Sequence, residues 1–95
     1  MRIIQQTQQT KPKEYKMAFK NKNMSVIAYA NSWTLWHYKS DDNMQITSMN
    51  GYFMPIHSLM SVGDIVIINA QDGTAIKAVK KIDSASSVLE VGNLD

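Results

Sequence analysis

The chain contains no cysteine, and its four glycines are isolated from one another among 95 residues. Without cysteine, a disulfide scaffold and the usual thiolate zinc sites are excluded. Isolated glycines exclude a glycine-rich loop that could hold phosphates. The longest aliphatic run, residues 65–68, is far shorter than the ~20 residues that cross a bilayer. The first ten residues turn to Gln and Thr after two isoleucines and lack the apolar core of a secretory signal. We therefore expect a soluble protein with no membrane partner.

Charged side chains make up 19% of the sequence, with a net charge of +2, and they are unevenly placed. Residues 1–22 contain six basic side chains and one acidic side chain, which gives +5. Residues 23–95 contain four basic and seven acidic side chains, which gives −3. A basic arm therefore precedes a mildly acidic body, and such arms commonly become ordered on a partner.

The length of the chain suits one small domain. We predict an extended, basic and Gln-rich N-terminal arm over residues 1–23 and a single β-rich domain over residues 24–95. The arm has no apolar period of its own, so its role is either to keep the protein soluble or to bind another subunit. Nucleic acid is disfavoured as its partner, because the lysines are dispersed and no arginine cluster or aromatic ladder accompanies them.

Runs of β-branched and aromatic residues alternate with turn residues through the body of the chain. The pair Asp72-Gly73 is a strong hairpin signal, because both residues tolerate positive φ. The expected strands cover residues 24–30, 33–39, 65–69, 74–82 and 87–91. We predict a mainly β (α+β) fold in which an antiparallel meander forms a small barrel or sandwich.

Two short helices are expected between the second and third strands. Ser40 resembles an N-cap followed by acidic residues, which predicts a helix over residues 41–49 that ends at Asn50-Gly51. Pro55 suits the first position of a second helix, over residues 55–60.

The densest aromatic stretch, residues 33–39, is expected to be a central strand. Alternation places Trp33, Leu35 and His37 on one face and Thr34, Trp36 and Tyr38 on the other. Large side chains on both faces predict a strand that is buried on both sides or covered by a neighbouring subunit. A stacking platform for bases or sugars is the alternative interpretation, and a core or subunit interface is favoured over it.

Little in the sequence points to catalysis. The only imidazoles belong to His37 and His57, and a Ser–His–Asp set can be written from Ser58, His57 and Asp64. No nucleophile elbow or oxyanion loop surrounds these residues. The run Asp41-Asp42-Asn43 lacks the alternating oxygen ligands of a calcium loop and is better explained as helix capping. We therefore predict a protein that is not an enzyme and needs no metal or cofactor.

Three separated motifs resemble a pattern found in small virion structural proteins of tailed bacteriophages. The pattern is an aromatic strand that ends in Thr or Ser and an Asp, then a short helix, then "GYF", a second short helix that contains Leu, and "GD" before an apolar strand. The resemblance covers about residues 32–92, and the second helix departs from it at residues 54–57. In this sequence the motifs are Trp33-Thr-Leu-Trp36-His-Tyr38-Lys-Ser-Asp41, Gly51-Tyr52-Phe53 and Leu59-Met-Ser-Val-Gly63-Asp64-Ile65.

The resemblance implies a role in the virion, most simply as a head decoration or cement protein that binds the major capsid protein or another virion protein. A tail or fibre protein is the alternative location. Physical reasoning agrees, since a small aromatic domain with exposed strand edges buries too little surface alone. Self-association, for example as a trimer, would close those edges. The expected subunit or lattice interface comprises Trp33, Trp36, Tyr38, Tyr52, Phe53, Lys11, Lys13 and Lys16.

Overall fold

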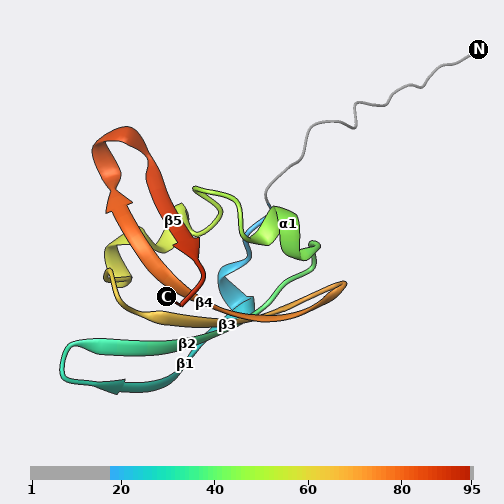
Figure 1. Ribbon diagram of the computed structural model, residues 1–95, viewed down its shortest axis with the longest axis horizontal. Coiled ribbons are helices and arrows are strands. Elements are labelled where there is room, and N and C mark those ends of the chain that lie inside the picture. The colour runs from blue at the N-terminus through green and yellow to red at the C-terminus, as the bar shows by residue number, and fades with distance from the viewer. Residues whose placement is uncertain (1–17, 95) are drawn as a thin grey trace, which may run out of the picture.

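The structure is a computed structural model that describes residues 18–94, and it contains one five-stranded sheet (Figure 1). The strands follow one another in space in the same order as in the sequence. Residues 1–17, and with them most of the predicted arm, lie outside the described residues. The strands are β1 (Met24–Ala30), β2 (Trp33–Lys39), β3 (Ile65–Ala70), β4 (Gly73–Asp83) and β5 (Val88–Gly92).

The mainly β fold class is confirmed, and the last three strands form the predicted antiparallel meander. The sheet as a whole is mixed, because β2 and β3 pair in parallel. A parallel pair needs a long crossover, and residues 40–64 supply it with both short helices. The strand order leaves β1 and β5 as two separate edges, so the molecule is an open sheet and not the closed barrel or sandwich of the prediction.

Tight turns connect the hairpins. Asn31 and Ser32 both have positive φ, of 55° and 62°, as the two central residues of a type I′ turn require. The second hairpin forms one residue earlier than predicted, because Ala70 pairs with Gly73 across the turn residues Gln71 and Asp72, and Asp72 does not have positive φ. Bulges in the ladders occur near Ile27 in β1 and near Lys80 in β4.

The first helix is shorter than predicted. Helix α1 covers only Met44–Thr47, and its N-cap is Asn43, whose side chain accepts a hydrogen bond from the Ile46 amide. Ser40 is not the cap, because its side chain is buried and bonded elsewhere. The second helix lies where Pro55 predicts it, as the 3-10 helix η3 (Met54–Leu59). Two further 3-10 turns are η2 (Asn21–Asn23) and η4 (Ser84–Ser86).

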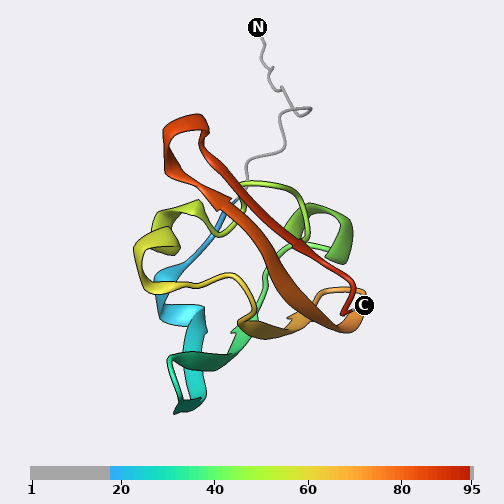
Figure 2. The same ribbon diagram turned by 60° about the vertical axis from the view of Figure 1, so that its left-hand side comes forward.

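The sheet is bent, and the β4–β5 hairpin turns away from the plane of β1 and β2 (Figure 2). Helices α1 and η3 lie on its concave side, and the core fills the space between them and the strands. Strand β2 is buried on that side only, since its burial alternates residue by residue. The prediction that other parts of the same chain bury both faces of β2 is therefore wrong. The buried core comprises Trp36, Tyr38, Tyr52, Phe53, Ile56, Met60, Val66, Ile68, Val79, Leu89 and Val91.

Candidate interaction surface

Four aromatic rings form the centre of the core. Tyr38 from β2 stacks on Phe19 with their ring centroids 5.2 Å apart, and Tyr52 and Phe53 meet both rings edge-on at 5.2–6.1 Å. Edge-on and offset-stacked pairs of this kind add stability beyond the area that they bury. Phe19 falls within the predicted arm, so the packed domain extends at least to this residue.

The hydroxyl groups of this cluster are joined in one line of hydrogen bonds. The Lys20 amide donates to the Tyr38 hydroxyl at 2.9 Å, and the Tyr52 hydroxyl donates to the Asp42 carboxylate at 2.7 Å. The two tyrosine oxygens are 3.2 Å apart, and Tyr38 is the donor because the hydrogen of Tyr52 is already used. Burial raises the pKa of the Tyr52 hydroxyl above its ordinary value, and the bond to Asp42 adds to the shift.

Ser40 belongs to a second small network beside this line. The Ser40 hydroxyl accepts from the Asp42 amide at 3.0 Å and lies 2.6 Å from the Thr47 hydroxyl. Thr47 donates its own hydrogen to the Asn43 carbonyl, so Ser40 is the donor between the two hydroxyls. This network explains why Ser40 does not cap the helix, and it fixes the end of β2 to α1.

Asp64 connects the crossover to β2 through its carboxylate. Three N–H groups donate to it, from the Thr34 amide, the Trp36 indole and the Ser61 amide, at 3.0–3.1 Å. The residue is 2% exposed, so these bonds replace the water that a buried carboxylate loses. Trp33 makes a parallel contact, with its indole donating to the Gly63 carbonyl at 2.9 Å. The sequence analysis considered Asp64 only as a member of a possible Ser–His–Asp set and of the "GD" motif, and it did not predict this structural role.

Within residues 18–94, no hydrogen bond joins Ser58, His57 and Asp64, the residues considered for catalysis. The Asp64 carboxylate is already occupied by N–H donors, and the His57 imidazole donates to the Met54 carbonyl at 3.0 Å. His37 lies on β2, where the Asn69 amide donates to its Nε2 at 2.8 Å. Within residues 18–94, no three His, Asp or Glu side chains are grouped closely enough to hold a metal ion.

The predicted interface residues divide into three groups. Trp36, Tyr38, Tyr52 and Phe53 are at most 6% exposed inside one copy of the chain, so their assignment to an interface is wrong. The same burial removes Trp36 and Tyr38 from any stacking platform for bases or sugars. Trp33 remains accessible at 38%. The three predicted lysines Lys11, Lys13 and Lys16 lie outside the described residues.

The accessible apolar surface lies on the convex side of the sheet. The strand register places His37, Ile67 and Ile76 in one row across β2, β3 and β4, and Leu35 and Ile65 in the next. Trp33 extends the second row toward the hairpin tip. Ile76 is 50% exposed and the others on β2 and β3 are half-buried. We call this set the outer face: Trp33, Leu35, His37, Ile65, Ile67 and Ile76.

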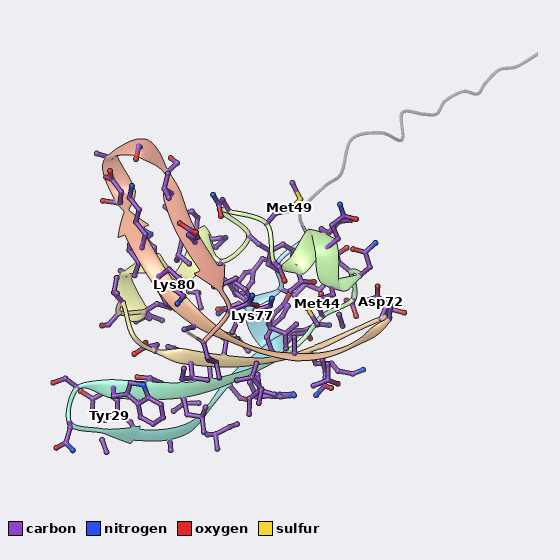
Figure 3. The ribbon with its side chains drawn as sticks, in the orientation of Figure 1. Tyr29, Met44, Met49, Asp72, Lys77 and Lys80 are labelled. Atoms are coloured by element: carbon purple, nitrogen blue, oxygen red, sulfur yellow. The ribbon has the colours of Figure 1, made fainter. Side chains whose placement is uncertain are left out.

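Strand β1 forms the edge of the sheet beside the outer face, and its register places Ser25, Ala28 and Ala30 on the convex side but Val26 and Tyr29 on the side of Trp36 and Thr34. It pairs only with β2, carries no charged residue and is exposed along almost its whole length. Val26, Ile27 and Tyr29 are 53–68% exposed. Figure 3 shows Tyr29 on the β1–β2 hairpin, far from α1. A two-stranded ribbon that buries so little is marginally stable in water by itself.

The outer face was missed by the sequence analysis, which looked for aromatic residues. A signal was present in residues 65–68, because four consecutive aliphatic residues in a strand place two on each face. One face fills the core with Val66 and Ile68, and the other leaves Ile65 and Ile67 without cover.

Two other features of the surface are less suited to binding. Lys20 and Asp41 form an exposed ion pair at 2.7 Å, which lowers the pKa of Asp41 and raises that of Lys20 through the hydrogen bond between them. A hollow of about 140 Å³ lies beside α1 and is lined by Asn43, Gln45, Ile46 and Met49. Its volume is below the usual range of small-molecule sites.

Comparison with known proteins returns no relative. No protein-family model, no curated protein and no solved structure matches this chain. None of the helices within residues 18–94 is long and apolar enough to span a bilayer.

Proposed function

We propose that this protein is a non-enzymatic structural protein of a tailed-phage virion, a head decoration or cement protein that oligomerises and stabilises the capsid lattice. The observations that carry the proposal are the outer face, whose six residues carry no charge, and the edge strand β1, which no other described element covers. Exposed apolar surfaces of this kind mark sites of protein association.

Hydrogen bonds between the three motifs support the proposal that rests on their resemblance to phage virion proteins. The aromatic strand, "GYF" and "GD" occur far apart in the sequence, yet Tyr38 meets Tyr52 and Trp36 meets Asp64. The motifs therefore act together to specify one fold. A family that shares all three would share the crossover and the sheet, together with the surfaces that this sheet exposes.

Stabilisation would follow from mass action. A protein that binds an assembled shell, and binds its free subunits less well, shifts the equilibrium toward the shell. Many copies around a shell would add their contacts, so each contact can be weak. In this proposal the major capsid protein is the partner, and Lys11, Lys13 and Lys16 would pair with acidic side chains on it.

The test is made on particles of the phage that encodes this sequence. Mass spectrometry of purified particles should detect the chain in many copies, and antibody labelling in electron micrographs should decorate the head. Particles from a phage that lacks the gene should release their DNA at a lower temperature than the parent. Absence of the chain from purified particles would overturn the proposal, and labelling of the tail or fibres would move the protein to that site.

Nucleic-acid binding is tested with the purified protein. Binding through phosphates should weaken steeply with salt, so a titration against random DNA gives a direct answer. We expect no salt-dependent binding, because Trp36 and Tyr38 are buried and the described residues carry equal numbers of basic and acidic side chains.

A further inference from the structure

We infer that residues 3–10 of one copy of this chain add as a strand to the free edge of β1 in a neighbouring copy. The inference rests on the proposed function, because it names a contact between copies in the oligomer that the function requires. It is supported by the open edge, by the composition of the segment, and by the place where the N-terminal part of the chain joins the domain.

The two edges of the sheet differ in their cover. At the β5 edge, the Gly51 amide of the crossover donates to the Leu89 carbonyl at 2.9 Å, and both Leu89 and Val91 are buried. Among the described residues, β1 pairs with β2 alone. Natural proteins protect edges with charged residues, prolines, bulges or a covering element, and β1 has only a bulge, near Ile27. The β1 edge is therefore open to a further strand.

The backbone of β1 offers hydrogen-bonding groups at this edge. The Thr34 amide donates to the Asp64 carboxylate, on the side of β2 that faces away from β1. In an antiparallel ladder such a residue exchanges no backbone bond with the residue opposite, which here is Tyr29. The N–H and C=O of Tyr29 therefore point outward, where an added strand would bind them.

The segment suits this edge in length and composition. Residues 3–10 have the sequence IIQQTQQT, which is eight residues against seven in β1, and neither stretch contains a charged residue, a proline or a glycine. Pairing of the two would bury no charge. Arg2 and the pair Lys11-Pro12 bound the segment, and proline cannot donate to a ladder, so the added strand would end there.

The two isoleucines of the segment supply an apolar contact in either register. Val26 and Tyr29 are 53% and 68% exposed on one side of β1. Neighbouring residues of a strand point to opposite faces, so either Ile3 or Ile4 falls on that side. Its contact with the side chains of β1 would add to the backbone bonds.

The place where the segment joins the domain favours a neighbouring copy over the same chain. Phe19 stacks on Tyr38 of β2, so the start of the described chain lies against β2 and not at the free edge of β1. Residues 11–17 contain no Gly, Asn or Asp to favour a turn back to that edge, and Pro12 favours an extended backbone before it. When extended, these seven residues span about 25 Å, which is enough to reach an adjacent copy.

The first experiment is sedimentation velocity of the full-length protein over a concentration series, comparing wild type with Thr7→Pro and Thr7→Ala. Thr7 lies near the middle of the segment; proline removes its amide hydrogen, whereas alanine keeps it. We expect wild type and Thr7→Ala to associate as concentration rises. The dissociation constant of Thr7→Pro should be at least about tenfold higher, because the ladder is interrupted.

The edge itself is tested in the same way with Tyr29→Lys and Leu59→Lys. The two side chains are similarly exposed, at 68% and 64%, but Leu59 lies on η3 and not on β1. A lysine protects an edge from pairing, so Tyr29→Lys should weaken association and Leu59→Lys should not. Circular dichroism would show that each variant is folded.

Cross-linking identifies the two partners, because the chain contains no cysteine. Thr7→Cys protein labelled with nitrogen-15 is mixed with unlabelled Tyr29→Cys protein and treated with a short bismaleimide. Mass spectrometry should detect mixed dimers, and far fewer when Leu59→Cys replaces Tyr29→Cys. This experiment remains informative if a proline or lysine variant misfolds.

Each contrary outcome overturns the inference separately from the proposed function. A wild type that stays monomeric at every concentration, or association that Thr7→Pro and Tyr29→Lys leave unchanged, would overturn it. A double variant, Thr7→Cys with Tyr29→Cys, that cross-links only within one chain would show that the segment covers its own edge, and this would also overturn it. The proposed function fails only if the chain is missing from virus particles, whatever its state in solution.

Discussion

Both sides of the sheet carry aliphatic side chains, but only the concave side combines them with a cluster of aromatic rings. The concave side contains aromatic rings whose polar ends are bonded to one another, as in the line from Tyr38 through Tyr52 to Asp42. The convex side contains mainly aliphatic side chains, such as Ile67 and Ile76, that have no polar atoms to satisfy. Directional bonds define one geometry, whereas aliphatic surface accepts any partner of matching shape. The first side therefore specifies the fold, and the second is suited to association.

The largest contrast is expected from removing one side chain on each side. Phe53→Ala should lower the free energy of unfolding by about 3–5 kcal/mol, because it leaves a cavity among three other rings. Ile76→Ala should cost about 1 kcal/mol or less, because its side chain is half exposed. Urea denaturation of both variants measures the difference. Equal losses would contradict the division of roles between the two sides.

Asp64→Asn should have the next largest effect on the free energy of unfolding. The substitution places an amide group where N–H donors from Thr34, Trp36 and Ser61 converge, so a buried donor is left facing another donor. We expect a loss of about 2–4 kcal/mol in the free energy of unfolding, measured by urea denaturation. Asp83→Asn is the matched control, since that carboxylate accepts from the exposed Ala85 amide. A loss below that of the control would show that Asp64 does not join β2 to the crossover.

Tyr52→Phe should have a smaller effect with a distinctive pH dependence. It removes the bond to Asp42 and should cost about 1–2 kcal/mol near neutral pH. The raised pKa of Tyr52 means that the folded protein keeps this proton at pH values where the unfolded chain loses it. Its contribution is therefore complete below the ordinary tyrosine value of about 10 and falls as pH rises above it.

Thermal unfolding from pH 8 to pH 11 tests this expectation. The wild type should lose stability with rising pH more steeply than Tyr52→Phe. Tyr29→Phe serves as the control for the loss of a tyrosine hydroxyl, because Tyr29 is exposed on the hairpin. Parallel slopes for wild type and Tyr52→Phe would contradict the assignment.

The smallest effect concerns the hairpin turn. Ser32 has a φ of 62°, which costs strain in a residue with a Cβ atom. Ser32→Gly should raise the free energy of unfolding by about 0.5 kcal/mol, since glycine adopts this conformation without strain. Val62→Gly, at an exposed position without positive φ, should not be stabilising. A destabilised Ser32→Gly variant would indicate that the turn has another conformation.

The strands were predictable because their signals are local. Residues that favour strands are bounded by turn pairs such as Asn31-Ser32 and Asp72-Gly73, and all five strands appear within one or two residues of the expected positions. The helix start was not predictable, because Ser40 is bonded to Thr47 and lies beside the aromatic core. The parallel pairing of β2 with β3 depends on the path of residues 40–64, which no local pattern encodes.

The interface was predictable only in part. Large aromatic residues are favoured both in cores and in interfaces, so their presence cannot distinguish the two. Tyr38 and Tyr52 belong to the core because their hydroxyl groups find partners there. Ile67 and Ile76 looked like ordinary strand residues, and only the register of the sheet places them side by side.

The parallel pairing of β2 with β3 has a consequence for the order of folding. Residues 24–39 and 65–92 each contain antiparallel neighbours joined by short turns, so each can pair locally. Joining the two halves requires closure of a 25-residue crossover. This closure costs chain entropy before the pairing of β2 with β3 can stabilise the sheet. The contacts of Asp64 with Thr34 and Trp36 span this closure. Docking of the two halves is therefore the step that should limit the folding rate.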